Sequence, residues 1–377
     1  MESRFNRLLL PGLVMRSTLI GATYSTGREV TEFFLKFGAF SGLIGLIAAT
    51  ALFSGFCIVA LELARRYQVL DYRSFSRIYM GKLWFLYEIG FIFGVMLTLS
   101  TIAAASAEIG ADLFKLPAFA TSLLVMTTIA LLVFAGSAIL ERVMAIWSMF
   151  FYAAYAVLLA LALYAFWDQI LIALSPAPVD PRSLLSALIY AGFSCSILPV
   201  IIYVARHLET TRDATIAGAL AGPMVFLPGL ALLIMLVPFL PGIIDEPAPI
   251  MNVLDSIKAP WLVTVIKIAI LGELSLTGAG LLHGINERVA NAAVERGRQL
   301  PWVFRPLLAV AALLFSVYLA AAVGLIDLVA FGFRYGAMLF LIIMVLPIIT
   351  RGLWMIRPKS RRSDEVTTTR GDRNGAA

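Results

Sequence analysis

The first long apolar stretch of the chain is interrupted by the polar, glycine-bounded segment Gly21-Ala22-Thr23-Tyr24-Ser25-Thr26-Gly27. A second interruption, near the start of the other half, reads Ala191-Gly192-Phe193-Ser194-Cys195-Ser196. Within a membrane, irregular backbone is tolerated only where protein buries it or where it lines a water-filled cavity. The two segments therefore predict two discontinuous membrane helices whose breaks lie at a cavity.

The composition places the chain among membrane proteins. Of its 377 residues, 61% are hydrophobic and 14% are charged, whereas soluble domains average roughly 45–50% apolar and about 25% charged residues. The formal net charge of +6 requires no nucleic-acid partner, because a membrane protein places such an excess in its cytoplasmic loops. Cys57 and Cys195 both lie in apolar runs, and they predict neither a disulfide framework nor a thiolate metal site.

Ten stretches are apolar and long enough to cross a membrane, which takes about 20 residues per helix. The predicted spans are 8–37, 40–64, 82–107, 117–138, 142–167, 184–206, 214–240, 260–283, 303–323 and 327–349. We expect one membrane domain over residues 1–350. Residues 351–377 are polar and basic, so they predict a disordered cytoplasmic tail.

Successive predicted loops are alternately rich and poor in Lys and Arg, and this bias sets the orientation of a membrane protein. With both termini cytoplasmic, the cytoplasmic loops hold most of the basic residues, among them Arg65 and Arg66. Arg66 is spaced to pair with Glu62 along one helix face. On the more acidic outer side, residues 248–258 carry apolar side chains at helical spacing, which predicts a short amphipathic helix.

Ten spans divide into five and five, and an odd number per half requires the second half to enter the membrane from the opposite side. We therefore expect an inverted repeat, with residues 8–170 as the first unit and 184–350 as the second. The two breaks align at one fixed offset, since Leu19-Ile20-x-Ala22-x-Tyr24-Ser25 matches Leu188-Ile189-x-Ala191-x-Phe193-Ser194. The expected fold is an all-α integral membrane protein of ten transmembrane helices, with helices 1 and 6 discontinuous.

A break supplies groups for binding, because an opened helical turn frees carbonyl groups for a cation and N–H groups for an anion. Glycine at such a place lets a ligand approach the backbone closely. The residues expected to bind a solute are Gly21, Ala22, Thr23, Tyr24, Ser25, Gly27, Ala191, Gly192, Phe193, Ser194 and Cys195. Close packing of neighbouring helices is the alternative explanation for the small residues.

The first break and the residues after it resemble a known family. Gly21-Ala22-x-x-Ser25-x-Gly27-Arg28-Glu29 and the following Phe33-Phe34-x-x-Phe37-Gly38 look like motifs of the YkvI-type bacterial membrane proteins. That family is similar to the amino acid–polyamine–organocation superfamily, whose members share the LeuT fold. The resemblance implies a transporter-like fold in the bacterial cytoplasmic (inner) membrane, and it implies no particular substrate.

Glu273 is the sharpest candidate for ion coupling, because a carboxylate near the middle of a span costs about 2.5–3.5 kcal/mol on insertion scales. Ser275 and Thr277 follow it. In sodium-coupled proteins of the resembled fold, hydroxyls of the eighth span help to hold a cation, and the resemblance implies this role for the two hydroxyls. The usual small-x-x-Thr-Ser pattern is not reproduced here, so a proton on Glu273 competes with sodium. A structural ion pair with Lys267 or another cation is the remaining alternative.

Three further charged residues adjoin the expected site. Glu88, in the third span, is expected either to bind a substrate ammonium or to pair with Arg28 or Arg334. Arg28 and Glu29 follow the first break directly, where we expect a gate, a carboxylate clamp or an outer salt bridge.

The leading interpretation is a secondary transporter that moves a small amino-acid-like or amine solute by symport with Na⁺ or H⁺, through alternating access around a midplane site. A ligand-sensing membrane receptor on the same fold is the alternative, and gradient-driven flux distinguishes the two. A channel is favoured less, because most spans are apolar on every face.

The sequence contains no catalytic set, metal-ligand cluster or phosphate-binding loop. We therefore expect no enzyme and no cofactor beyond the coupling ion. The expected partners are a small-molecule solute and the lipid bilayer, without nucleic acid. The identity and charge of the solute, the choice between sodium and proton, the direction of transport and the oligomeric state have no signal in the sequence.

Overall fold

The computed structural model describes residues 4–19, 23–135, 137–257, 259–295 and 304–356. In these ranges the chain is helical almost throughout and contains no β-strand. Gly21 and Ala22 of the first predicted break, and most of the predicted tail 351–377, lie outside the described residues. The expectation of an all-α protein is confirmed for the described part.

Seven helical segments of the described chain are long and apolar enough to cross a membrane. They are Ala39–Tyr67, Tyr72–Phe114, Arg142–Ala173, Thr211–Phe239, Pro260–Asn286, Pro306–Val323 and Leu325–Ile356. A further apolar helix, Ala118–Phe134, is shorter. The other two predicted spans, 8–37 and 184–206, consist of short helical pieces, as their interruptions predict.

The first predicted span is divided into several short helices. Its described pieces are α1 (Arg4–Leu8), α2 (Leu10–Leu19), the 3-10 turn η1 (Thr23–Thr26), α3 (Arg28–Phe33) and the 3-10 turn η2 (Leu35–Phe37). Gly27, between η1 and α3, has a φ of 82°, a left-handed conformation that favours glycine. A Cβ atom there would also lie 2.9 Å from Leu236 Cδ1. The backbone therefore has a conformation at position 27 that glycine adopts more easily than any other residue.

The second break lies further along the chain than we predicted. Residues 191–195 are the last turn of α9 (Pro181–Cys195), and they are regular helix. The interruption is at Ser196 and Ile197, before α10 (Leu198–Ile201) and the 3-10 segment η4 (Ile202–His207). Pro199 explains this position, because proline has no N–H to donate to the Cys195 carbonyl one turn earlier.

Long helices make up most of the remaining structure, with short 3-10 or π-helical pieces between some of them. In chain order these segments are α4 (Ala39–Tyr67), α5 (Tyr72–Met80), η3 (Gly81–Trp84), α6 (Phe85–Phe114), α7 (Ala118–Phe134), α8 (Ser137–Ala173), α11 (Thr211–Leu236), η5 (Val237–Phe239), α12 (Ile250–Ile257), α13 (Pro260–Glu295), α14 (Phe304–Val323), α15 (Leu325–Asp327), η6 (Leu328–Phe333), α16 (Arg334–Phe340), η7 (Leu341–Val345), η8 (Ile348–Gly352) and α17 (Leu353–Ile356).

The two halves of the chain meet where α4 crosses α11. A Cβ atom on Gly218 of α11 would lie 2.5 Å from the backbone nitrogen of Ile58 in α4, and one on Gly222 would overlap the Thr50 carbonyl. Small residues let membrane helices approach to backbone contact. This crossing therefore fixes the helices that follow the two interrupted segments against each other.

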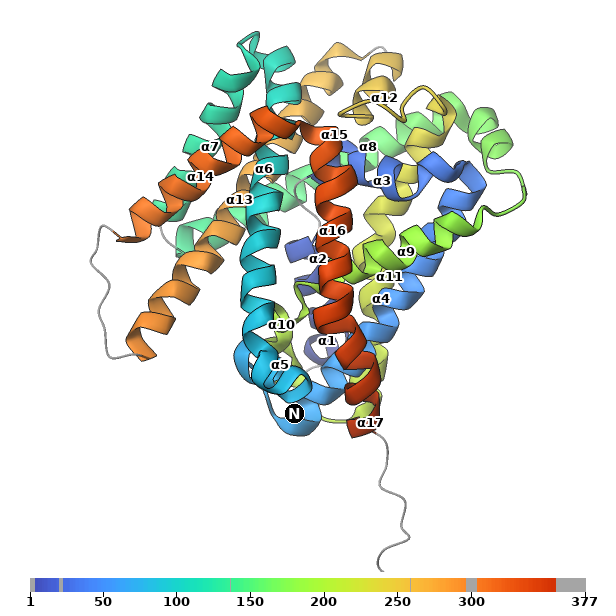
Figure 1. Ribbon diagram of the computed structural model, residues 1–377. Helices are drawn as coiled ribbons and strands as arrows, with labels where there is room; N and C mark the ends of the chain where they lie inside the picture. The colour runs from blue at the N-terminus through green and yellow to red at the C-terminus, as the bar shows by residue number, and fades with distance from the viewer. Residues whose placement is uncertain (1–3, 20–22, 136, 258, 296–303, 357–377) are drawn as a thin grey trace, which may run out of the picture.

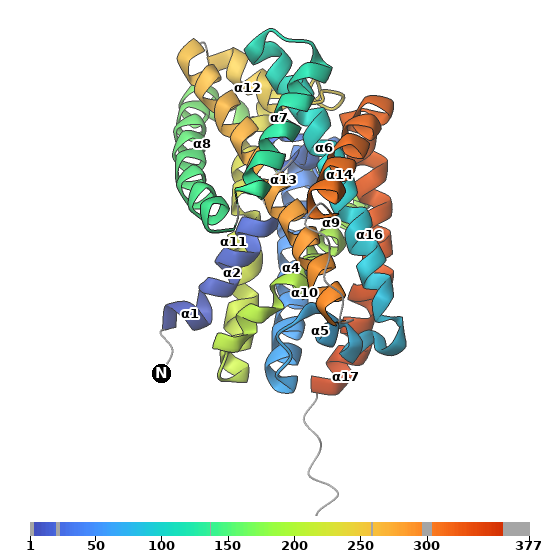
Figure 2. The same cartoon turned by 90° about the vertical axis from the view of Figure 1, so that its left-hand side faces the viewer.

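The bundle has two distinct ends in Figures 1 and 2. The first, called the α5 end here, holds α1, α5 and α17, and the opposite α12 end holds α12 and α3. The short helix α12 buries Ile250, Val253 and Leu254. The amphipathic helix predicted over residues 248–258 is therefore confirmed over residues 250–257.

Candidate functional site

A cavity lies between the two interrupted segments and the long helices α6, α11 and α13. Its wall is formed by Tyr24, Glu29, Phe91, Gly94, Val95, Thr98, Tyr190, Phe193, Ser194, Ser196, Ile197, Val225, Phe226, Thr277, Leu281, Phe333 and Phe340. Its volume, measured as the space open to the centre of a water molecule, is about 80 Å³. On the same measure one water needs roughly 10–15 Å³. The cavity therefore has room for a solute of several non-hydrogen atoms.

The secondary structure explains why these residues share one wall. Phe91, Gly94, Val95 and Thr98 are spaced by three and four residues along α6, so they form one helix face. Tyr24 belongs to η1, within the first break, and residues 196–197 are the second break itself. The irregular segments thus contribute directly to the wall, together with one face of a long helix.

Aromatic rings form much of this wall. The rings of Phe193 and Phe333 stack with centroids 4.5 Å apart, and Tyr24 stacks on Tyr190 at 6.5 Å. The Tyr190 ring also packs against the Phe226 ring in a tilted arrangement, with centroids 5.8 Å apart. Rings packed in this way hold one another in place, so the wall is shaped by side chains that have little freedom to move.

Glu29 brings a carboxylate to the aromatic wall. It lies in the first turn of α3, is 7% exposed, and its Oε2 accepts a hydrogen bond of 2.8 Å from the Tyr190 hydroxyl. Among the described lining residues, Glu29 carries the only formal charge. A buried carboxylate needs hydrogen bonds or a counter-charge, and a solute in this cavity lies within reach of it.

Arg28 and Glu32 point away from the cavity and join an ion network at the α12 end. The Arg28 guanidinium donates to the Ile244 carbonyl at 2.6 Å and to the Glu246 carbonyl at 3.1 Å. It also pairs with Glu32 at 2.9 Å. Lys36 and Arg334 complete the network by pairing with the same Glu32 carboxylate. Arg28 therefore ties α3 to the loop before α12, in line with the outer salt bridge expected for it.

Glu88 lies at the α5 end, and its expected pairing with Arg28 or Arg334 is wrong. It is in the first turn of α6, and its Oε2 is 3.9 Å from Arg288 Nη1 of α13. The Arg288 guanidinium also lies over the rings of Tyr72, at 4.1 Å, and Phe91, at 3.7 Å. Phe91 lines the cavity, so this cluster forms the layer below the cavity at the α5 end.

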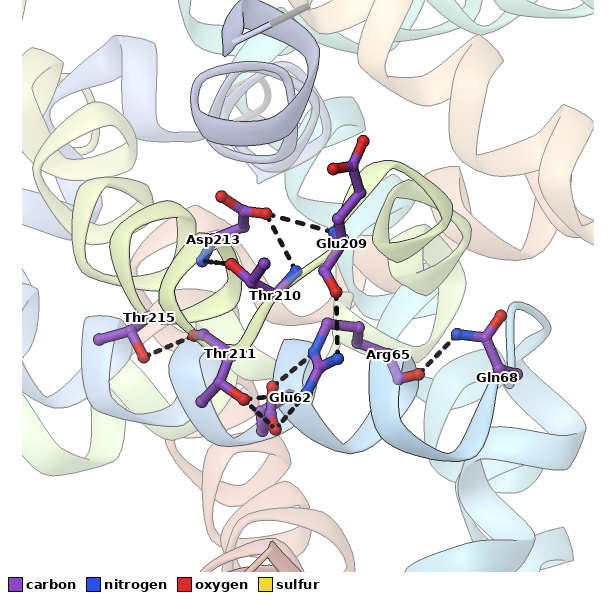
Figure 3. A network of polar contacts seen from close by, with 8 residues as sticks. All are labelled: Glu62, Arg65, Gln68, Glu209, Thr210, Thr211, Asp213 and Thr215. Carbon is purple, nitrogen blue, oxygen red and sulfur yellow. Dashed lines mark hydrogen bonds and ion pairs between the residues drawn. The ribbon is translucent and has the colours of Figure 1, made fainter. Parts of the chain in front are cut away.

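A polar network at the α5 end joins the last turns of α4 to the start of α11 (Figure 3). The Arg65 guanidinium binds the Glu62 carboxylate through two hydrogen bonds, of 2.7 and 2.8 Å. Thr211 donates to the same carboxylate at 3.1 Å. The predicted pair of Glu62 with Arg66 is therefore wrong, because Arg65 is the partner of Glu62. Arg65 also donates to Thr211 and to the Glu209 carbonyl.

Arg7 extends this network to the N-terminal helix. Its Nη1 is 2.7 Å from Glu209 Oε2 and 3.5 Å from Asp213 Oδ2. Asp213 and Thr210 form a capping box at the start of α11. Helix α1 is thus held by ion pairs, which are individually weak when they are partly exposed.

Replacing Arg65 by alanine is expected to lower the free energy of unfolding by about 3 kcal/mol, because it leaves the buried Glu62 carboxylate without its cation. Arg66→Ala is the matched control, since Arg66 is the exposed neighbour on the same helix. The measurement is thermal unfolding of both variants in detergent. Equal melting temperatures for the two variants would remove the stabilising role from Arg65.

Glu273 lies in α13 and is 8% exposed. It is close enough to Tyr155 of α8 for its charge to act on that residue, and the Tyr155 hydroxyl donates to the Ser25 carbonyl in η1. Ser275 donates to the Leu271 carbonyl within its own helix, at 2.8 Å. Glu273 thus lies near the tyrosine that donates to the Ser25 carbonyl within the first break.

Lys267 has a partner other than Glu273. It pairs with Asp112 at the far end of α6, and Asp112 also pairs with Lys115 at 2.9 Å. The alternative in which Lys267 neutralises Glu273 therefore has no support in the geometry.

The structure brings some of the predicted solute-binding residues to the cavity and places others elsewhere. Tyr24, Phe193 and Ser194 line it, as do Glu29 from the predicted gate and Thr277 from the predicted ion site. The following described residues are outside its wall: Ser25, Gly27, Glu88, Ala191, Gly192, Cys195, Glu273 and Ser275. Thr23 is in η1, and Gly21 and Ala22 lie outside the described residues.

Gly192 illustrates the alternative explanation by helix packing. A Cβ atom there would lie 2.5 Å from Leu341 of η7, so the missing side chain makes room for a neighbouring helix. Sequence reasoning also missed Tyr190, although this aromatic residue adjoins the predicted second break and its helical spacing to Ser194 would have placed both on one face.

No protein-family model matches the sequence, and no curated protein matches it either. Solved structures do match. The manganese transporter of Eremococcus coleocola, in complex with an aromatic bis-isothiourea substituted compound, has a TM-score of 0.58 at 14% identity, over 90% of this chain and 77% of that one. MhsT in complex with L-phenylalanine has a TM-score of 0.57 at 17% identity, over 90% and 88% of the two chains.

A third similar structure is Mhp1, a nucleobase-cation-symport-1 family transporter, in a closed conformation with bromovinylhydantoin bound. Its TM-score is 0.51 at 15% identity, over 92% of this chain and 78% of that one. Likenesses at these identities show the fold, which extends over about nine-tenths of the chain. The protein is therefore a multi-span membrane protein with the LeuT fold that these three transporters share.

Proposed function

We propose that this protein is a secondary active transporter of a small amino-acid-like or amine solute, coupled by symport to Na⁺ or H⁺ and working by alternating access. Ten spans in a five-plus-five inverted repeat belong to the proposal. So does a place in the bacterial cytoplasmic membrane with both termini in the cytoplasm, which the loop charges support. In that orientation the α5 end is cytoplasmic and the α12 end is outside.

The position of the cavity carries this proposal. Tyr24 contributes to its wall from within the first break, and Ser196 and Ile197 contribute from the second. In secondary transporters the solute lies at discontinuous helices near the middle of the membrane. A helix piece that rotates at a break can open the cavity towards one side while the other side stays closed.

Contacts made by arginine side chains near both ends of the cavity support alternate opening. At the α12 end, Arg28 joins α3 to the carbonyls of Ile244 and Glu246. At the α5 end, Arg288 packs beneath Phe91 near Glu88. Each contact joins separate helices, so it can be broken and remade as one helix moves relative to another.

Glu273 is proposed as the coupling residue, with Ser275 and Thr277 beside it. Its proximity to Tyr155, which donates to the Ser25 carbonyl, supports coupling, because that carbonyl belongs to the break that must move. Thr277 lines the cavity, one helical turn after Glu273. This turn of α13 therefore carries both the proposed coupling residue and a residue that faces the solute. A cation or proton at Glu273 would thereby favour one position of the first interrupted segment.

Flux into liposomes tests the proposed function. Purified protein would be reconstituted, given an inward gradient of Na⁺ or H⁺, and assayed for uptake of labelled amino acids and amines. We expect accumulation that disappears when an ionophore collapses the gradient. Specific binding without flux under either gradient would instead favour the ligand-sensing receptor.

A further inference from the structure

The described wall of the cavity combines one carboxyl side chain with an aromatic surface. Glu29 is the only formally charged residue in its described wall, and seven of the lining side chains are aromatic. A carboxylate in a site of low dielectric attracts cations strongly. Aromatic faces also attract cations, and they bind quaternary and methylated ammonium groups in other proteins. Both features of the wall favour the same kind of ligand.

We propose that Glu29 selects the solute by charge: the cavity takes a small organic cation, whose ammonium nitrogen contacts the Glu29 carboxylate and whose apolar part lies among the rings. This inference rests on the proposed function, which leaves the charge of the solute open. It assigns to Glu29 a role in binding in place of the gate that the sequence suggested.

Tyr190 fixes the Glu29 carboxylate in the wall. Its hydroxyl donates to Glu29 Oε2 at 2.8 Å, and hydrogen bonds to an ionised acceptor are the stronger ones. The Tyr190 ring is held between Phe33, at 4.9 Å between centroids, and Phe34, at 5.2 Å. The carboxylate is therefore positioned by a side chain that is itself packed on two sides.

The cations nearest to Glu29 in the sequence are engaged elsewhere. Arg28 bonds to Glu32 and to two backbone carbonyls, and Lys36 and Arg334 also pair with Glu32. None of these three cations is among the described residues of the cavity wall. The network at the α12 end thus gathers these three cations around Glu32.

Binding of three size-matched probes tests the charge preference without any need for transport. Benzylammonium, benzyl alcohol and benzoate would be titrated against the purified wild-type protein in detergent, by thermal shift and calorimetry, in potassium salts. Tetramethylammonium and butylammonium serve as further cations without a ring. We expect an ammonium ion to bind at least tenfold more tightly than benzyl alcohol, and benzoate to bind more weakly still.

Variants then assign the preference to Glu29. Glu29→Gln is expected to weaken ammonium binding by about ten- to a hundredfold, the loss typical of a charged hydrogen bond, and to leave benzyl alcohol binding unchanged. Glu29→Asp keeps the charge and should keep the preference at lower affinity. Glu32→Gln is the matched control, because this buried carboxylate lies one turn away on α3 outside the cavity; it should retain the preference.

Three outcomes would overturn the inference: no tighter binding of any ammonium ion than of benzyl alcohol by the wild-type protein, an equal loss in Glu32→Gln, or a Glu29-dependent thermal shift with NaCl alone and none with the ammonium ions. The first comparison uses only the wild-type protein, so it holds even if Glu29→Gln fails to fold. Ammonium binding that depends on Glu29, in a protein without flux, would uphold this inference and contradict the proposed function.

Discussion

Glu273→Gln is expected to abolish gradient-driven accumulation of solute while sparing solute binding and exchange. Glutamine has nearly the shape of a protonated glutamate, and it can neither release a proton nor attract a cation. Solute could therefore still enter and leave the cavity, whereas its movement would no longer be tied to the ion. The expected loss is complete for accumulation, because the ion gradient supplies all of its driving force.

The geometry gives the physical reason for this expectation. Glu273 is 8% exposed within α13, where a carboxylate is costly and is retained for a function by default. It lies near Tyr155, whose hydroxyl donates to the Ser25 carbonyl within the first break. Neutralising Glu273 would uncouple the ion from that segment.

Two assays in the same liposomes measure the effect, namely accumulation under a gradient and exchange of internal for external solute. Asp112→Asn is a control carboxylate from the Lys267 pair near the α12 end, and it should accumulate solute. Full accumulation by Glu273→Gln would make Glu273 structural and would move the coupling role to another group.

Gly229→Ala is expected to eliminate detectable solute binding. A Cβ atom at Gly229 of α11 would overlap the hydroxyl oxygen of Tyr24, so the tyrosine would have to leave its place in the cavity wall. Overpacking of this kind costs roughly 1–3 kcal/mol, and here the displaced ring is part of the binding surface. Titration of the variant with any solute or probe that the wild-type protein binds measures the loss.

A second substitution shows whether the clash itself is responsible. The Tyr24 hydroxyl has no hydrogen-bond partner among the described residues, so Tyr24→Phe should bind almost normally. The double variant Gly229→Ala, Tyr24→Phe removes the overlapping oxygen and should recover part of the affinity. Undiminished binding by Gly229→Ala alone would show that Tyr24 does not shape the site.

The first break was predictable from sequence because its signal is local. Gly27 adopts a left-handed φ, and glycine next to polar residues in an apolar run marks such a place. At the second break, small residues at 191–195 suggested an interruption where the helix is regular, and Pro199 was the better signal. Small residues serve helix packing as well as irregular backbone, as the contact of Gly192 with Leu341 shows, and only neighbouring helices distinguish the two uses.

Pairs of residues from distant parts of the chain were not predictable. Glu88 lies 3.9 Å from Arg288, and no local sequence pattern around either residue predicts the other as its partner. Glu62 had Arg65 and Arg66 within reach along its own helix, and Thr211 and Glu209 of another segment favour Arg65. Helical spacing gives the possible partners, and tertiary contacts choose among them.

The candidate site combines local and distant information in the same way. Tyr24, Phe193 and Ser194 were predicted because they adjoin the breaks, and they line the cavity. The hydrogen bond between Tyr190 and Glu29 joins residues 161 positions apart. This contact distinguishes Glu29 from its neighbour Arg28, whose side chain bonds to groups at the α12 end. From the sequence alone there was no reason to assign the two residues different roles.

Access to the cavity from both sides of the membrane tests alternating access most directly. Thr98 lines the cavity, so Thr98→Cys would be introduced after Cys57→Ala and Cys195→Ala, and treated with a membrane-impermeant thiol reagent from either side. Ser106→Cys, buried in the same helix and outside the cavity wall, is the unreactive control. We predict labelling of Thr98→Cys from both sides, with solute binding slowing both reactions. Labelling from one side only, with or without solute and a gradient, would contradict alternating access.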